Sequence, residues 1–421
     1  MPRPAKAPLL TLLAAMLWTT TIVVATAGTP SPPWPSIAWR SGPILPDGPH
    51  PDRQIETLSR KIGQMLMIGF PGTRPQDPGP TKVAAMIAAG EIGGVILFAD
   101  NVRSPKQLAA LTAALEAAGG SAPPFIAVDQ EGGSIQRLNR RKGFLPLASA
   151  KTMARKTPCE AYGLYLKTAE ELAAAHINVN FGPVVDLNIN PANPAIGKRS
   201  RSYGREPDQV VAFAEAFVDA HRAAGVLTAA KHFPGHGSAG RDPHIAVVDI
   251  SQTWEDQELL PFADLIEDDD VPMVMVGHLI HGRFSDGDRP TSLSRRAITA
   301  ELRDGLGFNG LVVTDDLGMD AITRRYEPEV AAAMAVRAGA DVLIFVNLWS
   351  TKPQALDRVV QAVAGDVAAG RIPARLVEES HARSRAAREA LGRRTAAPTA
   401  PQARDCTDPR AARPGDGPSQ G

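Results

Sequence analysis

Three observations predict an α/β protein of the (β/α)8 TIM barrel type, built as a single domain. The chain of 421 residues contains eight short, almost continuously apolar runs, which are typical of parallel strands buried on both faces. Segments with apolar residues at three- and four-residue spacing separate these runs, as in amphipathic helices. Several of these segments end in glycine, the residue that helix C-termini prefer. Eight strand–helix units in succession favour a closed barrel.

The apolar runs follow one another in the order in which a barrel uses its strands. They cover residues 62–70, 92–100, 124–130, 177–188, 225–233, 271–279, 310–316 and 340–347. The fourth boundary is approximate, and 178–188 is an equally good span. A doubly wound open sheet is the structural alternative. Because the first strand is not followed by G-x-G-x-x-G, dinucleotide binding has no support.

The two flanks differ in composition from this core. Residues 1–27 combine a basic start, an apolar stretch and the A-x-A pattern Ala25-Thr26-Ala27, which predict a cleaved secretory signal peptide. An uncleaved anchor is the alternative, but the apolar stretch is shorter than the roughly 20 residues that a spanning helix needs. Residues 28–54 form a Pro-rich leader, 55–393 carry the barrel domain, and 394–421 are expected to be a disordered tail. We therefore expect a secreted or periplasmic protein without stable membrane insertion after signal cleavage.

Charge and cysteine content narrow the range of partners. Lys and Arg together number 45, as do Asp and Glu, so the formal net charge is zero. The chain therefore carries no excess of charge that would indicate binding to nucleic acid or anionic membranes. The two cysteines, Cys159 and Cys406, could pair in a secreted protein, but the fold cannot depend on a disulfide framework. We expect a small-molecule ligand and a monomer.

Polar residues directly follow six of the predicted strands. Such positions lie at the carboxyl-end mouth of a barrel, where ligands bind. The six ends carry Asp129 with Glu131, Asp186, Lys231 with His232, His278, Asp315 with Asp316, and Asn347. One such residue is most often a structural rim residue, but six together are better explained by a polar ligand.

The stretch KHFPGHGSAGRDPH (231–244) has three interpretations. His232 and His236 have a helical metal-ligand spacing, but the intervening Pro and Gly make a helix improbable, and further ligands are not supplied nearby. A phosphate cradle lacks the order G-x-x-x-x-G-K-[ST]. The third interpretation is a mobile, glycine-hinged loop around residues 235–240 that delivers Asp242 and His244 as an acid/base pair. A solvated surface Asp and His is the bland alternative.

An acid/base pair of this kind needs a second carboxylate as nucleophile or stabiliser. GLVVTDDLGM places Asp315 and Asp316 at the end of the seventh strand, pointing opposite ways if extended. One faces the mouth, and the other is available for helix N-capping. A carboxylate with an acid/base group is the arrangement of a retaining glycosidase.

Together these residues resemble family 3 glycoside hydrolases of the β-N-acetylglucosaminidase type. KHFPGHG followed by D-x-H is similar to the family signature, and VDQEGGSIQR, NFGPVVDLNINPANPAIGKRSRSYG and GLVVTDDLGM resemble its other motifs in the same order. The resemblance covers roughly residues 55–390. With little chain after the last strand, it favours the single-barrel hexosaminidase type over members with a second sandwich domain.

The resemblance implies a role for each matching residue. Asp315 matches the nucleophile, and His244 with its partner Asp242 matches the general acid/base. The residues matching those that hold the N-acetylglucosamine hydroxyls are Asp129, Arg137, Lys231, His232 and Arg201. Arg199 rivals Arg201, because GKRSRSYG extends the family's R-S-[FY] motif. Pro243 departs from the Ser or Thr usual between Asp242 and His244.

The function implied is hydrolysis of terminal β-linked N-acetylglucosamine, as found in peptidoglycan fragments, without a metal or other cofactor. Three alternatives remain: a β-N-acetylglucosaminide phosphorylase, a non-catalytic barrel that binds cell-wall glycan, and a metal-dependent barrel hydrolase. The product formed in phosphate buffer separates the first, glycan binding without turnover identifies the second, and inhibition by a chelator identifies the third.

Overall fold

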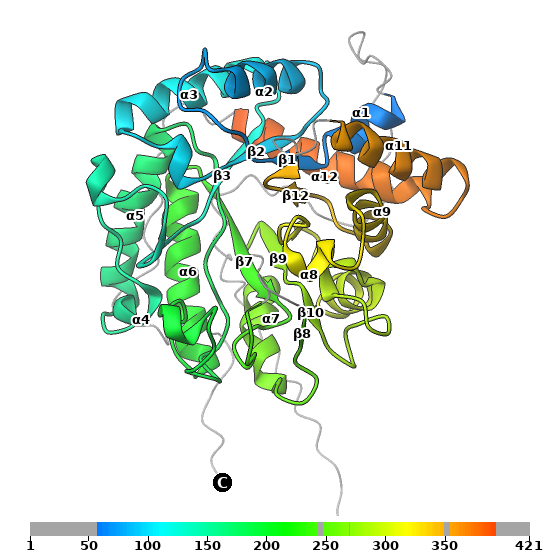
Figure 1. The fold of residues 1–421 in the computed structure, drawn as a ribbon. Coiled ribbons are helices and arrows are strands. Elements are labelled where there is room, and N and C mark those ends of the chain that lie inside the picture. Colours follow the sequence, from blue (N-terminus) through cyan, green and yellow to red (C-terminus); the bar gives the residue numbers. More distant parts are fainter. Residues whose placement is uncertain (1–56, 243–246, 269, 349–353, 393–421) are drawn as a thin grey trace, which may run out of the picture. The chain divides into compact units, whose positions relative to one another are not determined.

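The computed structural model describes residues 57–242, 247–268, 270–348 and 354–392. Eight parallel strands form its central sheet, with helices around them (Figure 1). The strands are β1 (Leu66–Ile68), β2 (Gly94–Leu97), β3 (Phe125–Val128), β6 (Val179–Asn180), β7 (Leu227–Phe233), β9 (Met273–Val276), β11 (Leu311–Thr314) and β12 (Leu343–Phe345). Each lies within one of the eight predicted runs, so the α/β barrel is confirmed.

The strand order shows how the sheet closes. Neighbours follow β11-β9-β7-β6-β3-β2-β1-β12, and every adjacent pair is parallel. A single parallel bridge between Val313 and Val342 joins the last two strands, β11 and β12. All carboxyl ends of the strands therefore lie at one mouth of the barrel.

Several helices begin at side chains that cap their free backbone N–H groups. Thr157 caps α5 (Pro158–Ala174) through a capping box with Glu160, and Ser104 caps α3 (Pro105–Ala118). The remaining helices around the barrel are α1 (Leu58–Gly63), α2 (Pro78–Ala88), α6 (Pro207–Ala223), α7 (Leu260–Glu267), the π-helix η6 (Arg296–Gly305), α9 (Pro328–Ala338), α11 (Ala355–Ala368) and α12 (Ala374–Gly392). Short helices α4 (Ala150–Met153) and α8 (Asp320–Thr323) lie in connecting segments.

The strands are shorter than the predicted runs, most of all in the first and the fourth. The first begins inside α1, whose last residues are Ile62 and Gly63, and only 66–68 form a strand. In the fourth run the strand stops at Asn180, shortly before Pro183, which has no N–H for the sheet. The chain then rejoins β7 through a bridge from Val184 to Lys231.

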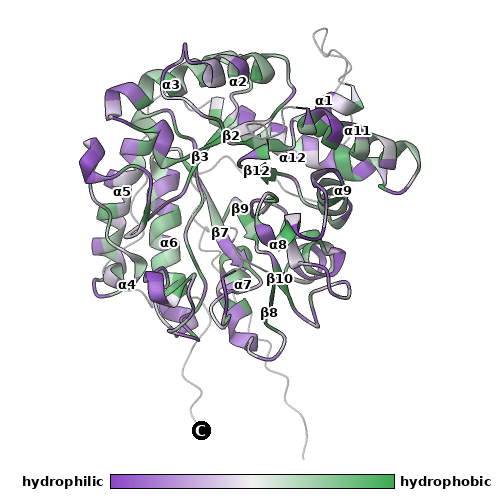
Figure 2. Cartoon of the chain, viewed as in Figure 1, coloured by the Kyte–Doolittle hydropathy of each residue, from purple (hydrophilic) through white to green (hydrophobic). Residues whose placement is uncertain are grey.

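The strands are buried along their length, while the helices carry both apolar and polar residues (Figure 2). Their apolar side chains form one large core cluster between the barrel and the helices. In the part of the chain that the structure describes, every helix is too short or too polar to cross a bilayer. The predicted signal peptide, leader and tail lie outside the described residues.

Candidate active site at the carboxyl ends of the strands

A network of buried charges occupies the mouth beside β3 and β7. The Nζ atom of Lys231 lies 2.8 Å from Oδ1 of Asp129 and 2.7 Å from Oε1 of Glu131. Arg137 reaches the second oxygen of Asp129 at 3.1 Å. The Lys231 side chain is only 2% exposed, so these interactions are made with little water present.

Arg201 extends the network on the other side of Glu131. Its Nε and Nη2 atoms each lie 2.8 Å from a different oxygen of Glu131, a bidentate pair. Its Nη1 also donates to the carbonyl of Ala195 at 3.1 Å. Arg199, the rival residue, is exposed and donates to the carbonyl of Pro194 instead. The structure thus brings Arg201, and not Arg199, together with the other predicted sugar-binding residues.

The pKa values of this network are set by competition between burial and charge. Burial acts to raise the pKa of Asp129, but the charges of Lys231 and Arg137 outweigh it and hold that pKa below its usual value. For Glu131, Arg201 and Lys231 likewise overcome burial and lower the pKa. Burial acts to lower the pKa of Lys231, but the two carboxylates raise it. All these groups are therefore charged at neutral pH and preorganised for a polar ligand.

His232 is oriented by a carboxylate from the neighbouring strand connection. Its Nδ1 lies 2.7 Å from Oδ2 of Asp186, and its backbone N–H donates to the other oxygen at 3.1 Å. Nη2 of Arg201 lies 3.3 Å from Nε2 of His232. Because arginine only donates, Nε2 must accept, which assigns the neutral Nδ1–H tautomer to this histidine.

The segment from Pro234 to Ala239 is anchored from both sides, which contradicts its interpretation as a hinge. All its residues are buried. Its backbone groups bond to Trp254 (3.1 Å), Asp186 (2.8 Å), Asn193 (2.8 Å), Asn190 (both contacts 3.1 Å) and Glu258 (3.1 Å). A Cβ at Gly237 would lie 1.6 Å from the carbonyl oxygen of Leu187, so this glycine permits close packing. Gly240, by contrast, has open space around it.

Asp315 and Asp316 have different environments at the end of β11. Oδ1 of Asp316 accepts the backbone N–H groups of Gly318 at 2.8 Å and Val346 at 3.0 Å. The carbonyl of Asp316 also accepts from Nε2 of His278 at 2.9 Å, while Nδ1 of this histidine accepts from the Ser292 hydroxyl at 2.7 Å. Asp316 therefore ties the loop to β12, rather than capping α8. Asp315 is partly exposed, and its Oδ1 accepts the N–H of Asp316 at 2.8 Å.

The predicted acid/base pair is only partly described. Asp242 is partly buried and lies three residues beyond the anchored segment. His244 and Pro243 fall outside the described residues. Their assignment stays a prediction.

Glu131 and Asp186 belong to the candidate site, although the sequence analysis assigned neither of them a role. Both were recognised as polar residues at strand ends, and that position was the available signal. What the sequence could not show is that Glu131 bridges Lys231 to Arg201, or that Asp186 orients His232.

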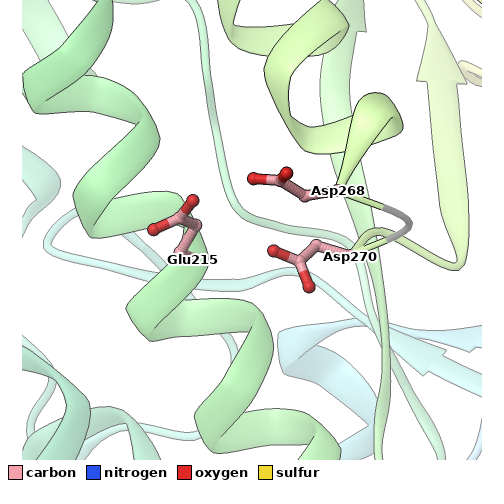
Figure 3. A group of neighbouring side chains, drawn as sticks. All are labelled: Glu215, Asp268 and Asp270. Carbon is pink, nitrogen blue, oxygen red and sulfur yellow. The ribbon is translucent and has the colours of Figure 1, made fainter. Parts of the chain in front are cut away.

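Metal binding through His232 and His236 is not favoured by the geometry. Nδ1 of His232 is engaged by Asp186, and its Nε2 lies 3.3 Å from the cationic guanidinium of Arg201, which would repel a metal ion at this nitrogen. Elsewhere in the described residues, Glu215, Asp268 and Asp270 place ligand atoms within 4.8 Å of one another (Figure 3). Glu215 lies on α6, Asp268 and Asp270 directly precede β9 at the opposite end of the strands, and Arg222 already pairs with Asp270 at 3.2 Å. This group takes no part in the candidate site.

Comparisons with known proteins relate this barrel to one enzyme family. The Glycosyl hydrolase family 3 N terminal domain matches residues 57–386. Beta-hexosaminidase A of Pseudoalteromonas piscicida is 34% identical over 320 residues, which are 68% of this chain and 53% of that protein. Beta-hexosaminidase of Tolumonas auensis is 37% identical over 265 residues, 61% of this chain and 76% of that protein.

A solved structure agrees with these matches. The glycoside hydrolase family 3 beta-N-acetylglucosaminidase from Paenibacillus sp. str. FPU-7 has a TM-score of 0.72 and 34% identity. The likeness covers 80% of this chain and 63% of that one. This chain thus spans about half to two thirds of the Pseudoalteromonas and Paenibacillus proteins. Because the family domain covers most of the chain, the chain belongs to glycosyl hydrolase family 3.

Proposed function

We propose that the protein is a retaining exo-β-N-acetylglucosaminidase that hydrolyses terminal β-linked N-acetylglucosamine. The observation that carries this proposal is the preorganised network of Asp129, Lys231, Glu131 and Arg201 at the mouth where β11 presents Asp315. The similarity to hexosaminidases and to a β-N-acetylglucosaminidase supports the substrate class.

The proposed sugar-binding residues provide complementary hydrogen-bonding groups. Lys231, Arg137 and Arg201 are donors held in place by carboxylates, and Asp129 is an acceptor for sugar hydroxyls. His232 offers Nε2 beside Arg201, and Asp186 keeps the ring in one tautomer. A site that is already ordered loses little entropy when the sugar binds.

In the proposed reaction, Asp315 attacks the anomeric carbon and forms a covalent glycosyl-enzyme. His244, protonated and paired with Asp242, donates its proton to the leaving oxygen as the glycosidic bond breaks. Water then attacks the same carbon, neutral His244 accepts its proton, and Asp315 leaves as a carboxylate. The two displacements retain the β configuration. No metal or other cofactor is needed in this scheme.

The natural substrate we propose is a peptidoglycan fragment, and the location is outside the cytoplasm. This rests on the signal-like residues 1–27. N-terminal sequencing of the protein recovered from the periplasm or medium tests it. A mature chain that begins at Gly28 is expected, and a full-length cytoplasmic chain would contradict export.

A panel of aryl glycosides tests the activity. The β-N-acetylglucosaminide should be cleaved far faster than the corresponding glucoside, with the β-anomer as first product by NMR. Asp315→Asn should lower kcat by at least about 1,000-fold, whereas Asp320→Asn, an exposed carboxylate on α8, should change it little. Wild-type turnover by Asp315→Asn would reject this nucleophile.

The same assay in phosphate buffer separates hydrolysis from phosphorolysis. Free N-acetylglucosamine is the expected product. Accumulation of the sugar 1-phosphate would instead identify a phosphorylase, and glycan binding without turnover would identify a non-catalytic barrel.

A further inference from the structure

Glu258 is a buried acid that takes no part in the charge network at the mouth. It lies in the 3-10 helix η4 (Asp256–Leu259) and is 0% exposed. Its Oε1 accepts the backbone N–H of Glu255 at 3.2 Å, which closes the first turn of its own helix. Its Oε2 accepts the backbone N–H of Ser238 at 3.1 Å. One carboxylate thus joins this helix to the anchored segment 234–239.

The segment and Glu258 are packed directly against each other. At Gly235, whose φ is +119°, a Cβ would lie 2.7 Å from Cβ of Glu258 and 3.3 Å from its Oε2. Trp254, which precedes the same helix, donates to the carbonyl of Pro234 at 3.1 Å. The remaining side-chain anchors, Asp186, Asn190 and Asn193, all come from the connection that follows β6.

Glu258 and Trp254 hold different parts of the segment 234–239 from the same side. Among the described residues, Glu258 is the side chain from the η4 side that holds the later half of the segment, because Trp254 reaches only Pro234. Its removal would leave the buried Ser238 N–H without this hydrogen-bond acceptor, at a cost of about 1–3 kcal/mol. The chain leads from this point through Gly240 to Asp242.

We propose that Glu258 is a positioning residue for proton transfer. It holds the backbone at Ser238, and this fixed backbone determines where the following residues place Asp242 relative to the reacting bond. This rests on the proposed function. Glu258 itself touches neither the sugar-binding cluster nor Asp315 through any contact found in the described residues. Its loss should therefore weaken acid catalysis more than it weakens nucleophilic attack.

The leaving group distinguishes these two effects. Departure of a dinitrophenolate needs almost no protonation, whereas an alkoxide leaves only with help from the general acid. We therefore compare kcat/KM, which reports formation of the glycosyl-enzyme, for a dinitrophenyl and a methyl β-N-acetylglucosaminide. A variant that only loses folded protein or sugar affinity lowers both values by the same factor.

Glu258→Ala should lower kcat/KM about 100-fold for the methyl glycoside, since a displacement of about 1 Å costs that much. For the dinitrophenyl glycoside, the decrease should stay within about 3-fold. Glu258→Gln retains an oxygen for Ser238 but turns an N–H₂ toward Glu255, so an intermediate loss is expected. If Glu258→Ala does not fold, the Gln variant carries the comparison.

Glu255→Gln is the matched control. This residue lies in the same turn, but its carboxylate pairs with the exposed Arg205 at 3.2 Å rather than with the segment. It should leave both rate constants near wild type. Equal losses on the two substrates, or a Glu255→Gln effect like that of Glu258→Gln, would overturn the positioning role while leaving the proposed hydrolase intact. A wild-type protein that cleaves neither substrate would overturn both.

Discussion

His232 and Asp186 are joined twice: Nδ1 of the histidine lies 2.7 Å from one carboxylate oxygen, and its backbone N–H lies 3.1 Å from the other. Asp186 is fully buried and also accepts the N–H of His236 at 2.8 Å. The same carboxylate therefore fixes a ring at the mouth and the backbone that follows β7. It lies behind the predicted sugar-binding cluster and supports it.

The first prediction concerns this carboxylate. Asp186→Asn places an amide where two acceptor oxygens are needed, so His232 loses its fixed tautomer beside Arg201. We expect kcat/KM for an aryl β-N-acetylglucosaminide to fall about 10- to 100-fold, as for other buried groups that orient a ligand-binding histidine. Asp249→Asn, an exposed carboxylate that accepts from Ser251, is the control. Unchanged kinetics in Asp186→Asn would remove this supporting role.

The second prediction concerns the buried cation between Asp129 and Glu131. Lys231→Ala leaves two carboxylates together without the cation that contacts both of them. Removing one member of a buried ion pair costs about 3–5 kcal/mol, so urea denaturation should show a loss of this size. Lys61→Ala breaks an ion pair with Glu378, whose side chain is 53% exposed. This loss should cost less than about 1 kcal/mol. Equal losses would mean that the network contributes little to folding.

Much of the fold could be predicted from the sequence because buried parallel strands are continuous apolar runs. All eight runs contain a strand, and a polar residue at the carboxyl end of a run lies at the mouth by topology alone. Asp129, Lys231, His232 and Asp315 were found in this way. Arg137 and Arg201 lie beyond the strands in connecting segments, and the resemblance to a known family was needed to select them.

The sequence could not give contacts between distant segments. Gly235 and Gly237 suggested a hinge, because glycine has the widest backbone freedom. Their neighbours in space, Glu258 and Leu187, show that the missing side chains are needed for close packing. Glu258 carried no signal either, since an acid three residues after Glu255 at a helix start is an ordinary capping residue.

The third prediction is a pH dependence of stability that arises from Glu258. Burial raises the pKa of this carboxyl to about 7, an effect to which the charge of Asp186 adds and which the Ser238 and Glu255 hydrogen bonds oppose. A raised pKa in the folded state means that the folded protein binds this proton more tightly than the unfolded chain does. The stabilisation is therefore complete below about pH 4.5 and is lost as the pH rises through about 7.

Glu258→Gln removes this titration. The free energy of unfolding of the wild type, relative to this variant, should fall by on the order of 3 kcal/mol between pH 4.5 and 8. Urea denaturation at several pH values measures the difference. Parallel curves for wild type and Glu258→Gln would show that the buried carboxyl does not titrate in this range.

The fourth prediction separates an anchored segment from a hinge by two glycines that are three residues apart. A Cβ at Gly237 would meet the backbone oxygen of Leu187 at 1.6 Å, and backbone cannot move aside as a flexible side chain can. Gly237→Ala should therefore destabilise the protein by about 2 kcal/mol or more and lower activity with it. At Gly240 a Cβ meets nothing within 4 Å, so Gly240→Ala should leave stability within about 0.5 kcal/mol of wild type. Thermal unfolding and turnover of both variants provide the measurement.

A hinge at Gly235–Gly240 predicts the opposite pattern, in which stability is kept in both variants and turnover falls because the backbone has become stiffer. A tolerated alanine at Gly237 would thus refute the anchored segment, whereas a large loss at Gly237 with none at Gly240 would place any remaining freedom of this connection beyond Ala239.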